Sequence, residues 1–275
     1  MERVFLSTKD MQMISLEILK TISKICEDNC FRYFLAYGTL LGAVRHNGFI
    51  PWDDDVDIMM PRPDYDLFID YFIHHSKDYP NLRLFNNDTC AQYPYMISRI
   101  SDDRYRIIMN NERPYGMGIF VDIYPLDGMG DSLNEAIKFG KKGDFLSSVC
   151  YQSTRQHFAI ETTTDPLKKL IKLPFFLFSK ALGKEWAQSK LRSLANYKKY
   201  DHCNYVGCVV WLSGGAKDIF NKEMFNQYEM ATFEDAKFRI PKKYDEILRQ
   251  LYGEYMKLPP EKDRVGHHEY VAYKK

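Results

Sequence analysis

The chain has 275 residues, enough to bury a hydrophobic core as one large domain or two smaller ones. Its 38 Lys and Arg residues balance 37 Asp and Glu residues, which gives no support for a nucleic-acid partner, because such proteins usually carry a basic excess. No apolar run approaches the ~18 residues of a membrane-spanning helix, and the first residues lack the apolar stretch of a signal peptide. We therefore expect a cytoplasmic protein whose six scattered cysteines are reduced.

The first predicted elements lie between residues 8 and 50. Apolar residues at helical spacing predict a helix over 8–29 with Thr8 as its N-cap. A strand over 31–37 then leads into a short helix over 40–46. Gly48 lies where a chain that leaves a helix often adopts the left-handed conformation.

Strands and one further helix continue this pattern to about residue 130. The helix is predicted over 64–75, and the strands over 56–60, 82–86, 94–100, 104–109 and 118–124. Such an alternation predicts a mixed α/β sheet, of the α/β or α+β class, with helices against it.

After residue 132 the pattern becomes mostly helical. Residues 132–200 carry helical periodicity that Pro166 and Pro174 interrupt, and a further helix is predicted over 244–255. The sequence therefore predicts a sheet-containing core followed by a helical part.

The predicted boundary between these parts lies near residue 130, which divides the chain into 1–130 and a mostly helical region, 131–275, packed on it. Within the second part, 168–184 mixes Lys with Leu, Phe and Ile. This composition is typical of helices at a membrane surface and also of an ordinary packed helix. Peripheral contact with the inner face of the membrane therefore stays open, and nothing in the sequence indicates an oligomeric state.

The most informative segment is 52–58, with the sequence WDDDVDI. If it enters a strand, the period of two places Asp55 and Asp57 on one face and Val56 and Ile58 on the other. Two carboxylates ~4 Å apart repel by about 4 kcal/mol at an effective dielectric constant near 20. A divalent cation removes this repulsion, and carboxylate oxygens suit Mg²⁺ or Mn²⁺.

A second strand, within 119–124, places Asp122 in an otherwise apolar run. A buried carboxylate is costly unless it has a partner, so we expect Asp122 beside Asp55 and Asp57, with all three holding the metal. The alternative is a solvated acidic turn at 53–57 with Asp122 capping a loop. A calcium-binding EF-hand loop is excluded because its sixth position is Ile58 instead of Gly.

A site for phosphate is predicted where Gly38 and Thr39 follow a strand and open a helix. The free N–H groups and the dipole at a helix start bind anions, Gly38 allows close approach, and Thr39 adds a hydroxyl. Arg45 can supply a planar fork to phosphate oxygens. Arg99, on a predicted strand, is a second phosphate contact or one half of a surface ion pair.

Together these segments resemble a known family. Residues 37–46 (YGTLLGAVRH) and 48–57 (GFIPWDDDVD), with Asp122 on a later strand, resemble the LicD family of phosphocholine transferases and fukutin-related catalytic domains, which has a nucleotidyltransferase-like fold. The tail is similar as well, in Ile240-Pro241, 251–260 (LYGEYMKLPP) and His267-His268.

The resemblance implies a metal-dependent transferase that takes a phosphate-linked alcohol from a CDP-activated donor. The donor is typically CDP-choline, with CDP-ribitol and CDP-glycerol as other choices, the acceptor is a sugar hydroxyl of a surface glycan or lipid-linked precursor, and CMP leaves. The catalytic core is then 1–130, and 131–275 serves the acceptor. A choline head group needs aromatic faces, for which Trp52 comes first, followed by Tyr95, Tyr115, Tyr124 and Trp211.

Two other functions remain open. A nucleotidyltransferase would use the same acids to attach NMP to a small alcohol, and it would release pyrophosphate instead of CMP. A non-catalytic nucleotide- or glycan-binding protein would show no turnover, although the presence of Asp55, Asp57 and Asp122 argues against it.

Overall fold

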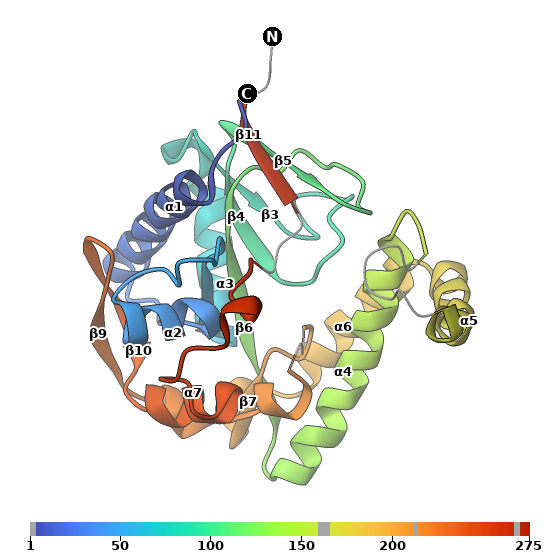
Figure 1. Ribbon diagram of the computed structural model, residues 1–275. Coiled ribbons are helices and arrows are strands. Elements are labelled where there is room, and N and C mark those ends of the chain that lie inside the picture. The colour runs from blue at the N-terminus through green and yellow to red at the C-terminus, as the bar shows by residue number, and fades with distance from the viewer. Residues whose placement is uncertain (1–3, 159–165, 212–213, 267–269) are drawn as a thin grey trace.

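A computed structural model describes residues 4–158, 166–211, 214–266 and 270–275, with only the backbone of 166–171. Its centre is a mixed sheet that contains, in spatial order, β1 (Phe34–Leu35), β2 (Asp57–Pro61), β6 (Phe120–Gly130), β4 (Ser98–Asp102) and β3 (Leu82–Phe85). β2 and β6 are parallel, and the other pairs are antiparallel. The predicted mixed sheet is therefore confirmed (Figure 1).

The two parallel strands are buried along their whole length, because each is an almost continuous apolar run, as parallel strands with both faces covered require. Their register places Asp57 directly beside Asp122, and the next strand places Arg99 opposite Asp122. A row of three charged residues thus crosses the sheet in an otherwise apolar environment.

The first helix, α1 (Thr8–Asp28), packs against β4 and β6. Its N-cap is Ser7, one residue before the predicted Thr8. The Ser7 hydroxyl accepts a hydrogen bond from the Asp10 N–H, and the Asp10 carboxylate accepts one from the Ser7 N–H, so the two residues form a capping box.

The short helix α2 (Tyr37–His46) begins three residues earlier than predicted. It ends at Asn47, which adopts the left-handed conformation (φ 55°) predicted for Gly48. At Gly48, a Cβ would lie 2.4 Å from Glu234 Oε1, so a larger residue would displace the Glu234 side chain. Gly42 likewise allows the backbone carbonyl of Gly48 to approach α2.

The other helices surround the sheet. They are α3 (Arg62–His74), α4 (Leu133–Thr154), α5 (Pro166–Leu182), α6 (Lys184–Tyr197) and α7 (Tyr244–Tyr252), with short 3-10 turns at Ser76–Asp78, Tyr200–His202, Gly215–Asp218, Lys222–Phe225 and Glu261–Asp263. α5 begins at Pro166, whereas Pro174 lies inside α5, so the prediction that Pro174 breaks the helix is wrong. α4 contacts both α5 and α6, and these three helices lie together on one side of the molecule (Figure 1).

The second half of the chain also supplies strands. β7 (Tyr205–Gly207) pairs with the distal part of β6 and with β8 (Phe220–Asn221). β9 (Tyr228–Phe233) and β10 (Ala236–Pro241) form a hairpin, and β11 (Tyr270–Lys274) pairs with β5 (Tyr105–Met109). Because β7 and β11 pair with strands of the first half, residues after 130 are held against the sheet. The domain boundary near residue 130 stays a prediction.

No helix in the described ranges is long and apolar enough to cross a membrane. All six cysteines are free, as predicted. On α5, Leu177 and Phe178 are 57% and 47% exposed. Membrane contact through 168–184 stays a prediction.

Candidate active site

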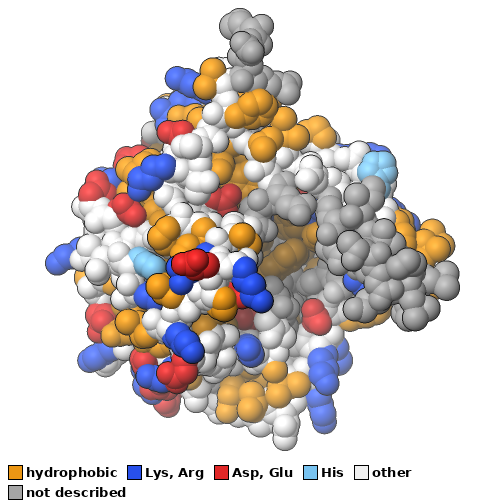
Figure 2. Space-filling view, in the orientation of Figure 1, with side chains coloured by type: hydrophobic (Ala, Val, Ile, Leu, Met, Phe, Trp, Pro, Cys, Tyr) orange, Lys and Arg blue, Asp and Glu red, His pale blue; other side chains and the backbone are white. Residues whose placement is uncertain are grey.

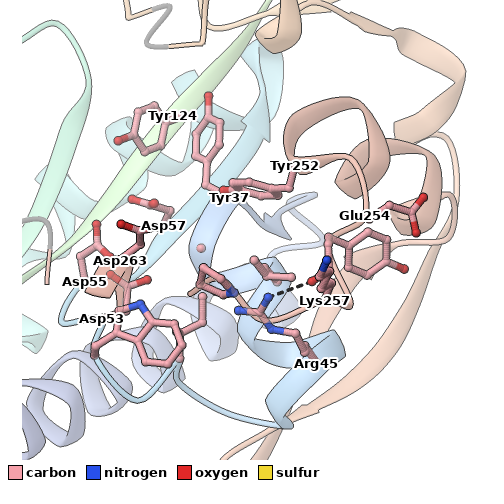
Figure 3. A pocket seen from close by; sticks show the side chains of 16 residues that line it. Tyr37, Arg45, Asp53, Asp55, Asp57, Tyr124, Tyr252, Glu254, Lys257 and Asp263 are labelled. Carbon is pink, nitrogen blue, oxygen red and sulfur yellow. Dashed lines mark hydrogen bonds between the residues drawn. The ribbon is translucent and has the colours of Figure 1, made fainter. Parts of the chain in front are cut away.

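The acidic segment at the start of β2 lines a cavity of about 510 Å³. Asp53, Asp55 and Asp57 lie together in its wall, and Asp263 from the tail lies near them (Figure 3). Val56 and Ile58 are fully buried in the core. The predicted separation of the acids from the apolar residues is therefore confirmed.

Asp57 is the most constrained of these acids. It is 6% exposed, its N–H donates to the Thr39 hydroxyl at 2.8 Å, and its Oδ1 has no hydrogen-bond partner in the part of the chain described. Burial raises the pKa of Asp57 well above its usual value, and the neighbouring charges of Asp55, Asp122 and Asp53 raise it further. A carboxylate in this environment favours a cation beside it.

The donor set fits Mg²⁺ or Mn²⁺ only in part. Within the described ranges, no three His, Cys, Asp or Glu side chains form a ready ligand group. Mg²⁺, however, commonly binds one or two carboxylates together with substrate phosphates and water. Asp55 and Asp57 therefore fit a cation whose remaining ligands come from a phosphate-containing substrate.

Asp122 and Arg99 form a buried ion pair behind this cavity. Arg99 Nε donates to Asp122 Oδ1, and Nη2 donates to Oδ2 at 3.2 Å. The guanidinium carbon also lies 4.6 Å from the Tyr95 ring centroid and 4.2 Å from that of Phe120. Arg99 therefore forms an ion pair, but the pair is buried. The prediction of a surface ion pair is wrong.

Asp122 and Arg99 are not among the residues that line the acidic cavity. Asp122 does lie beside Asp57. This placement was predicted from the free-energy cost of burying a carboxylate without a partner. Because Arg99 is bonded to both oxygens of Asp122, Arg99 supports this carboxylate instead of extending toward a phosphate. The predicted metal role of Asp122 and phosphate role of Arg99 stay untested.

The start of α2 adjoins the acids in a way that the sequence did not predict. Gly38 lines the cavity, and a Cβ there would lie 2.6 Å from Asp53 Oδ2. Thr39 is 4% exposed and does not line the cavity; its hydroxyl fixes Asp57 through the backbone. The geometry thus gives Thr39 a positioning contact and places a carboxylate next to Gly38, while the predicted phosphate contacts of Gly38 and Thr39 stay predictions.

Replacing Thr39 by Val is expected to destabilise the protein by about 1–3 kcal/mol, because the buried Asp57 N–H loses its acceptor. Urea unfolding at equilibrium measures this change. Thr39→Ser keeps the hydroxyl and serves as the matched control. Equal stability of the Val variant and the wild type would show that this hydrogen bond does not support Asp57.

The rest of the cavity wall carries cations and aromatic rings. Arg45 and Lys257 lie away from Asp53, Asp55 and Asp57, with Glu254 on the same side as Lys257 (Figure 3). Arg45 Nη1 donates to the Tyr255 carbonyl at 2.8 Å. Tyr37 and Tyr124 are in edge-to-face contact, with ring centroids 5.2 Å apart. Acids, cations and rings therefore share one cavity.

Of the aromatic residues proposed for a head group, Trp52 and Tyr124 line this cavity, while Tyr95, Tyr115 and Trp211 do not. Sequence reasoning missed Tyr37, Asp53, Tyr252, Glu254, Tyr255, Lys257 and Asp263 as cavity residues. Tyr252, Glu254, Tyr255 and Lys257 belong to the tail motif 251–260, which resembles the family but indicates no chemical role by itself. His267-His268 lie outside the described residues.

The mixed sheet, with paired acids at the start of β2 and beside the start of α2, agrees with the nucleotidyltransferase class that the family comparison indicates. Residues 30–175 match the family described as LicD/FKTN/FKRP, nucleotidyltransferase domain. The chain is also 34% identical over 269 residues to the lipopolysaccharide cholinephosphotransferase LicD of Haemophilus influenzae, with 98% of each chain covered. This protein therefore belongs to the LicD family.

Two shorter similarities are to uncharacterized proteins. One, from Rickettsia typhi, is 29% identical over 119 residues, which cover 40% of this chain and 37% of that protein. The other, from Rickettsia prowazekii, is 44% identical over 48 residues, or 18% of each chain.

Proposed function

We propose that this protein transfers phosphocholine from CDP-choline to a sugar hydroxyl of a lipopolysaccharide or similar surface glycan and releases CMP. The observation that carries the proposal is the similarity along 98% of both chains to a lipopolysaccharide cholinephosphotransferase. The cavity beside β2 supports it, because acids, cations and aromatic rings are all available to one ligand.

The charge distribution of the cavity suits such a donor. Arg45 and Lys257 can pair with phosphate oxygens of the donor on the side opposite Asp55 and Asp57. The rings of Trp52, Tyr37 and Tyr124 line the cavity, and aromatic faces favour a quaternary ammonium group over a neutral polyol. The cavity therefore favours choline over ribitol or glycerol as the head group.

Asp55 and Asp57 would hold Mg²⁺ or Mn²⁺ against the donor. When bound, the cation would offset the charge that develops on the phosphate oxygens as CMP leaves. Thr39 fixes the backbone at Asp57, and this contact keeps the carboxylate at the cavity wall. Gly38 leaves room for Asp53 beside the same wall.

Asp122 supports this site from behind in the proposed scheme. It lies next to Asp57 and is held by Arg99, so it adds negative charge to the cation site and fixes the sheet register. Asp122 does not line the cavity, so an acceptor hydroxyl bound there would not contact its carboxylate directly. We therefore assign Asp122 to orientation of the site, with proton acceptance as the alternative.

The proposal is tested by incubating the protein with Mg²⁺, a lipooligosaccharide free of phosphocholine, and CDP-choline, CDP-ribitol or CDP-glycerol in separate reactions. Separation of the nucleotide products distinguishes the functions. CMP formed with CDP-choline is the expected result. CMP formed only with another donor would assign that donor's head group in place of choline. Separate reactions with CTP and a small alcohol test nucleotidyl transfer, which would release pyrophosphate. Absence of product in every reaction would favour a binding protein.

A location at the inner face of the membrane belongs to the same proposal. A lipid-linked acceptor would bring the protein to a membrane surface, where the exposed Leu177 and Phe178 of α5 could make contact.

A further inference from the structure

A second cavity, of about 540 Å³, lies where the loop after β5 meets the end of α4 and the junction of α5 and α6. Four cationic side chains line it, namely Arg113, Arg155, Lys180 and Lys184, against two acidic ones, Glu112 and Glu185. None of these residues has a part in the transfer chemistry proposed above. The cavity therefore has a positive excess without an assigned role.

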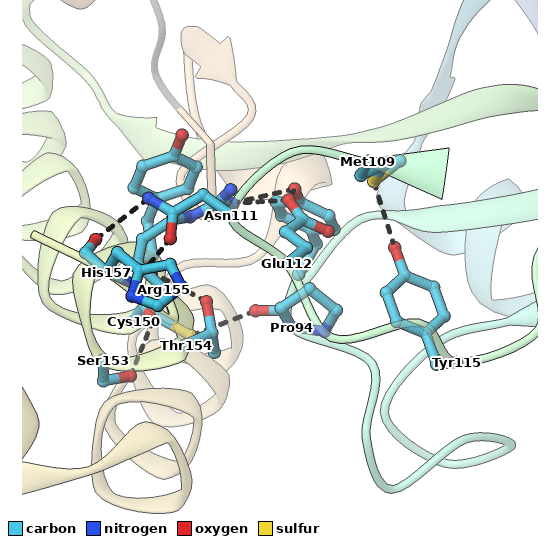
Figure 4. Close-up of polar contacts among 12 residues, drawn as sticks. Pro94, Met109, Asn111, Glu112, Tyr115, Cys150, Ser153, Thr154, Arg155 and His157 are labelled. Atoms are coloured by element: carbon cyan, nitrogen blue, oxygen red, sulfur yellow. Dashed lines mark hydrogen bonds and ion pairs between the residues drawn. The ribbon is translucent and has the colours of Figure 1, made fainter. Parts of the chain in front are cut away.

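Arg155 and Glu112 form the buried wall of this cavity (Figure 4). They are 5% and 7% exposed. Arg155 Nη2 donates to Glu112 Oε1 at 2.6 Å and to the Tyr95 hydroxyl at 3.1 Å, and the Tyr95 hydroxyl donates to the same Glu112 oxygen. Arg155 Nε and Glu112 Oε2 are buried without a hydrogen-bond partner in the described structure. Buried polar atoms are rarely left unsatisfied without a functional reason.

Two lysines are fixed near this wall by backbone carbonyls. Lys180 Nζ donates to the carbonyls of Ser153 and Arg155, and Lys184 Nζ donates to that of Ala91. Burial lowers the pKa of Lys180, and the positive charges of Arg113 and Arg155 lower it further. These like charges repel one another, and a bound anion would relieve the repulsion.

A chain of buried side chains connects this cavity to the acidic one. Tyr95, bonded to Glu112, packs on the Arg99 guanidinium, which is bonded to Asp122 beside Asp57. Tyr95, Arg99 and Asp122 therefore link the wall of the second cavity to Asp57 through the protein interior.

We propose that the second cavity binds a phosphate or carboxylate group of the glycan acceptor and so positions an acceptor hydroxyl for transfer. The acceptor part of this inference rests on the proposed function. The CDP-activated donor is a less suitable ligand for this second cavity, because the acidic cavity has its own cations, Arg45 and Lys257, for the donor phosphates. Arg113 and Lys180 remain as an excess of positive charge beyond the Arg155–Glu112 and Lys184–Glu185 ion pairs, and this excess favours an anion over a neutral sugar.

Binding of glucose 6-phosphate, glucose and inorganic phosphate, measured by ligand-detected NMR, tests this site without requiring turnover. The double variant Arg113→Glu/Lys180→Glu should bind glucose 6-phosphate at least about tenfold more weakly, while Asp57→Asn should bind it as the wild type does. Lys190→Glu, an exposed lysine on α6 that does not line this cavity, is the matched control and should also bind normally.

Three results would overturn the inference: unchanged binding in the double variant, an equal loss in Lys190→Glu, or inorganic phosphate binding as tightly as the sugar phosphate. In transfer assays, the double variant should raise the KM for a phosphorylated acceptor about tenfold and leave the KM for CDP-choline unchanged. If the binding results hold while no CMP forms from any donor, the proposed function fails and the anion site stands.

Discussion

Replacing Asp57 by Asn is expected to reduce CMP release from CDP-choline by about a thousandfold while the protein remains folded. Loss of a metal ligand removes several kcal/mol of stabilisation from the transition state, and each 1.36 kcal/mol is worth about a factor of ten. The side chain is replaced by one of the same size, and its N–H still donates to Thr39. Asp144→Asn, which changes an exposed acid on α4, is the matched control.

The same variant should be more stable than the wild type when no metal is present. The pKa of Asp57 is raised in the folded state, so the stability that its protonated form contributes is complete below its unfolded pKa of about 3.9. This contribution is lost as the pH rises through the folded pKa, at about 1.4 kcal/mol per pH unit. Asn cannot ionise and avoids the loss.

Urea unfolding at about pH 5 and about pH 8 checks this expectation. Without metal, the wild type should lose more stability than Asp57→Asn between the two conditions. Mg²⁺ with CDP-choline should restore the stability of the wild type and have little effect on the variant. Normal turnover by a folded Asp57→Asn protein would remove Asp57 from the mechanism.

Replacing Arg99 by Met should destabilise the protein by about 3–5 kcal/mol, because Asp122 then remains as a buried charge without its partner. The double variant Arg99→Met/Asp122→Leu removes both charges and should recover most of this loss. Arg249→Gln provides a control, since Arg249 is paired with Asp245 on the exposed surface of α7. Its replacement should lower the free energy of unfolding by only about 0.3–0.5 kcal/mol.

Urea unfolding of the four proteins gives these differences directly. A double variant as unstable as Arg99→Met would mean that the cavity left by the side chains, and not the unpaired charge, causes the loss. Arg99→Met with wild-type stability would contradict the structural role of the pair.

The shared placement of Asp55 and Asp57 could be predicted from the sequence because the relevant rule is local. A period of two along one strand determines which side chains share a face, and this placed Asp55 and Asp57 together with Val56 and Ile58 opposite them. A carboxylate buried in an apolar strand needs a partner, and this rule correctly predicted that Asp122 lies near Asp57.

Contacts between distant segments could not be predicted in the same way. Periodicity gives the faces of a strand but not the register between strands, so the pairing of Arg99 with Asp122 was considered only as a surface contact. The wall formed by Tyr252, Tyr255 and Lys257 depends on how the tail folds back on α2, which no local pattern specifies. The N-cap at Ser7 was missed by one residue because Ser7 and Thr8 are both good caps.

The most direct test of the account is Mn²⁺ binding in the presence of CDP-choline, measured by electron paramagnetic resonance. The central claim is that Asp55 and Asp57 hold one divalent cation against the donor in the cavity beside β2. We expect one bound ion per wild-type chain, strongly weakened binding in Asp55→Asn and Asp57→Asn, and normal binding in Asp144→Asn. Binding of the same strength in Asp57→Asn and the wild type would contradict the claim.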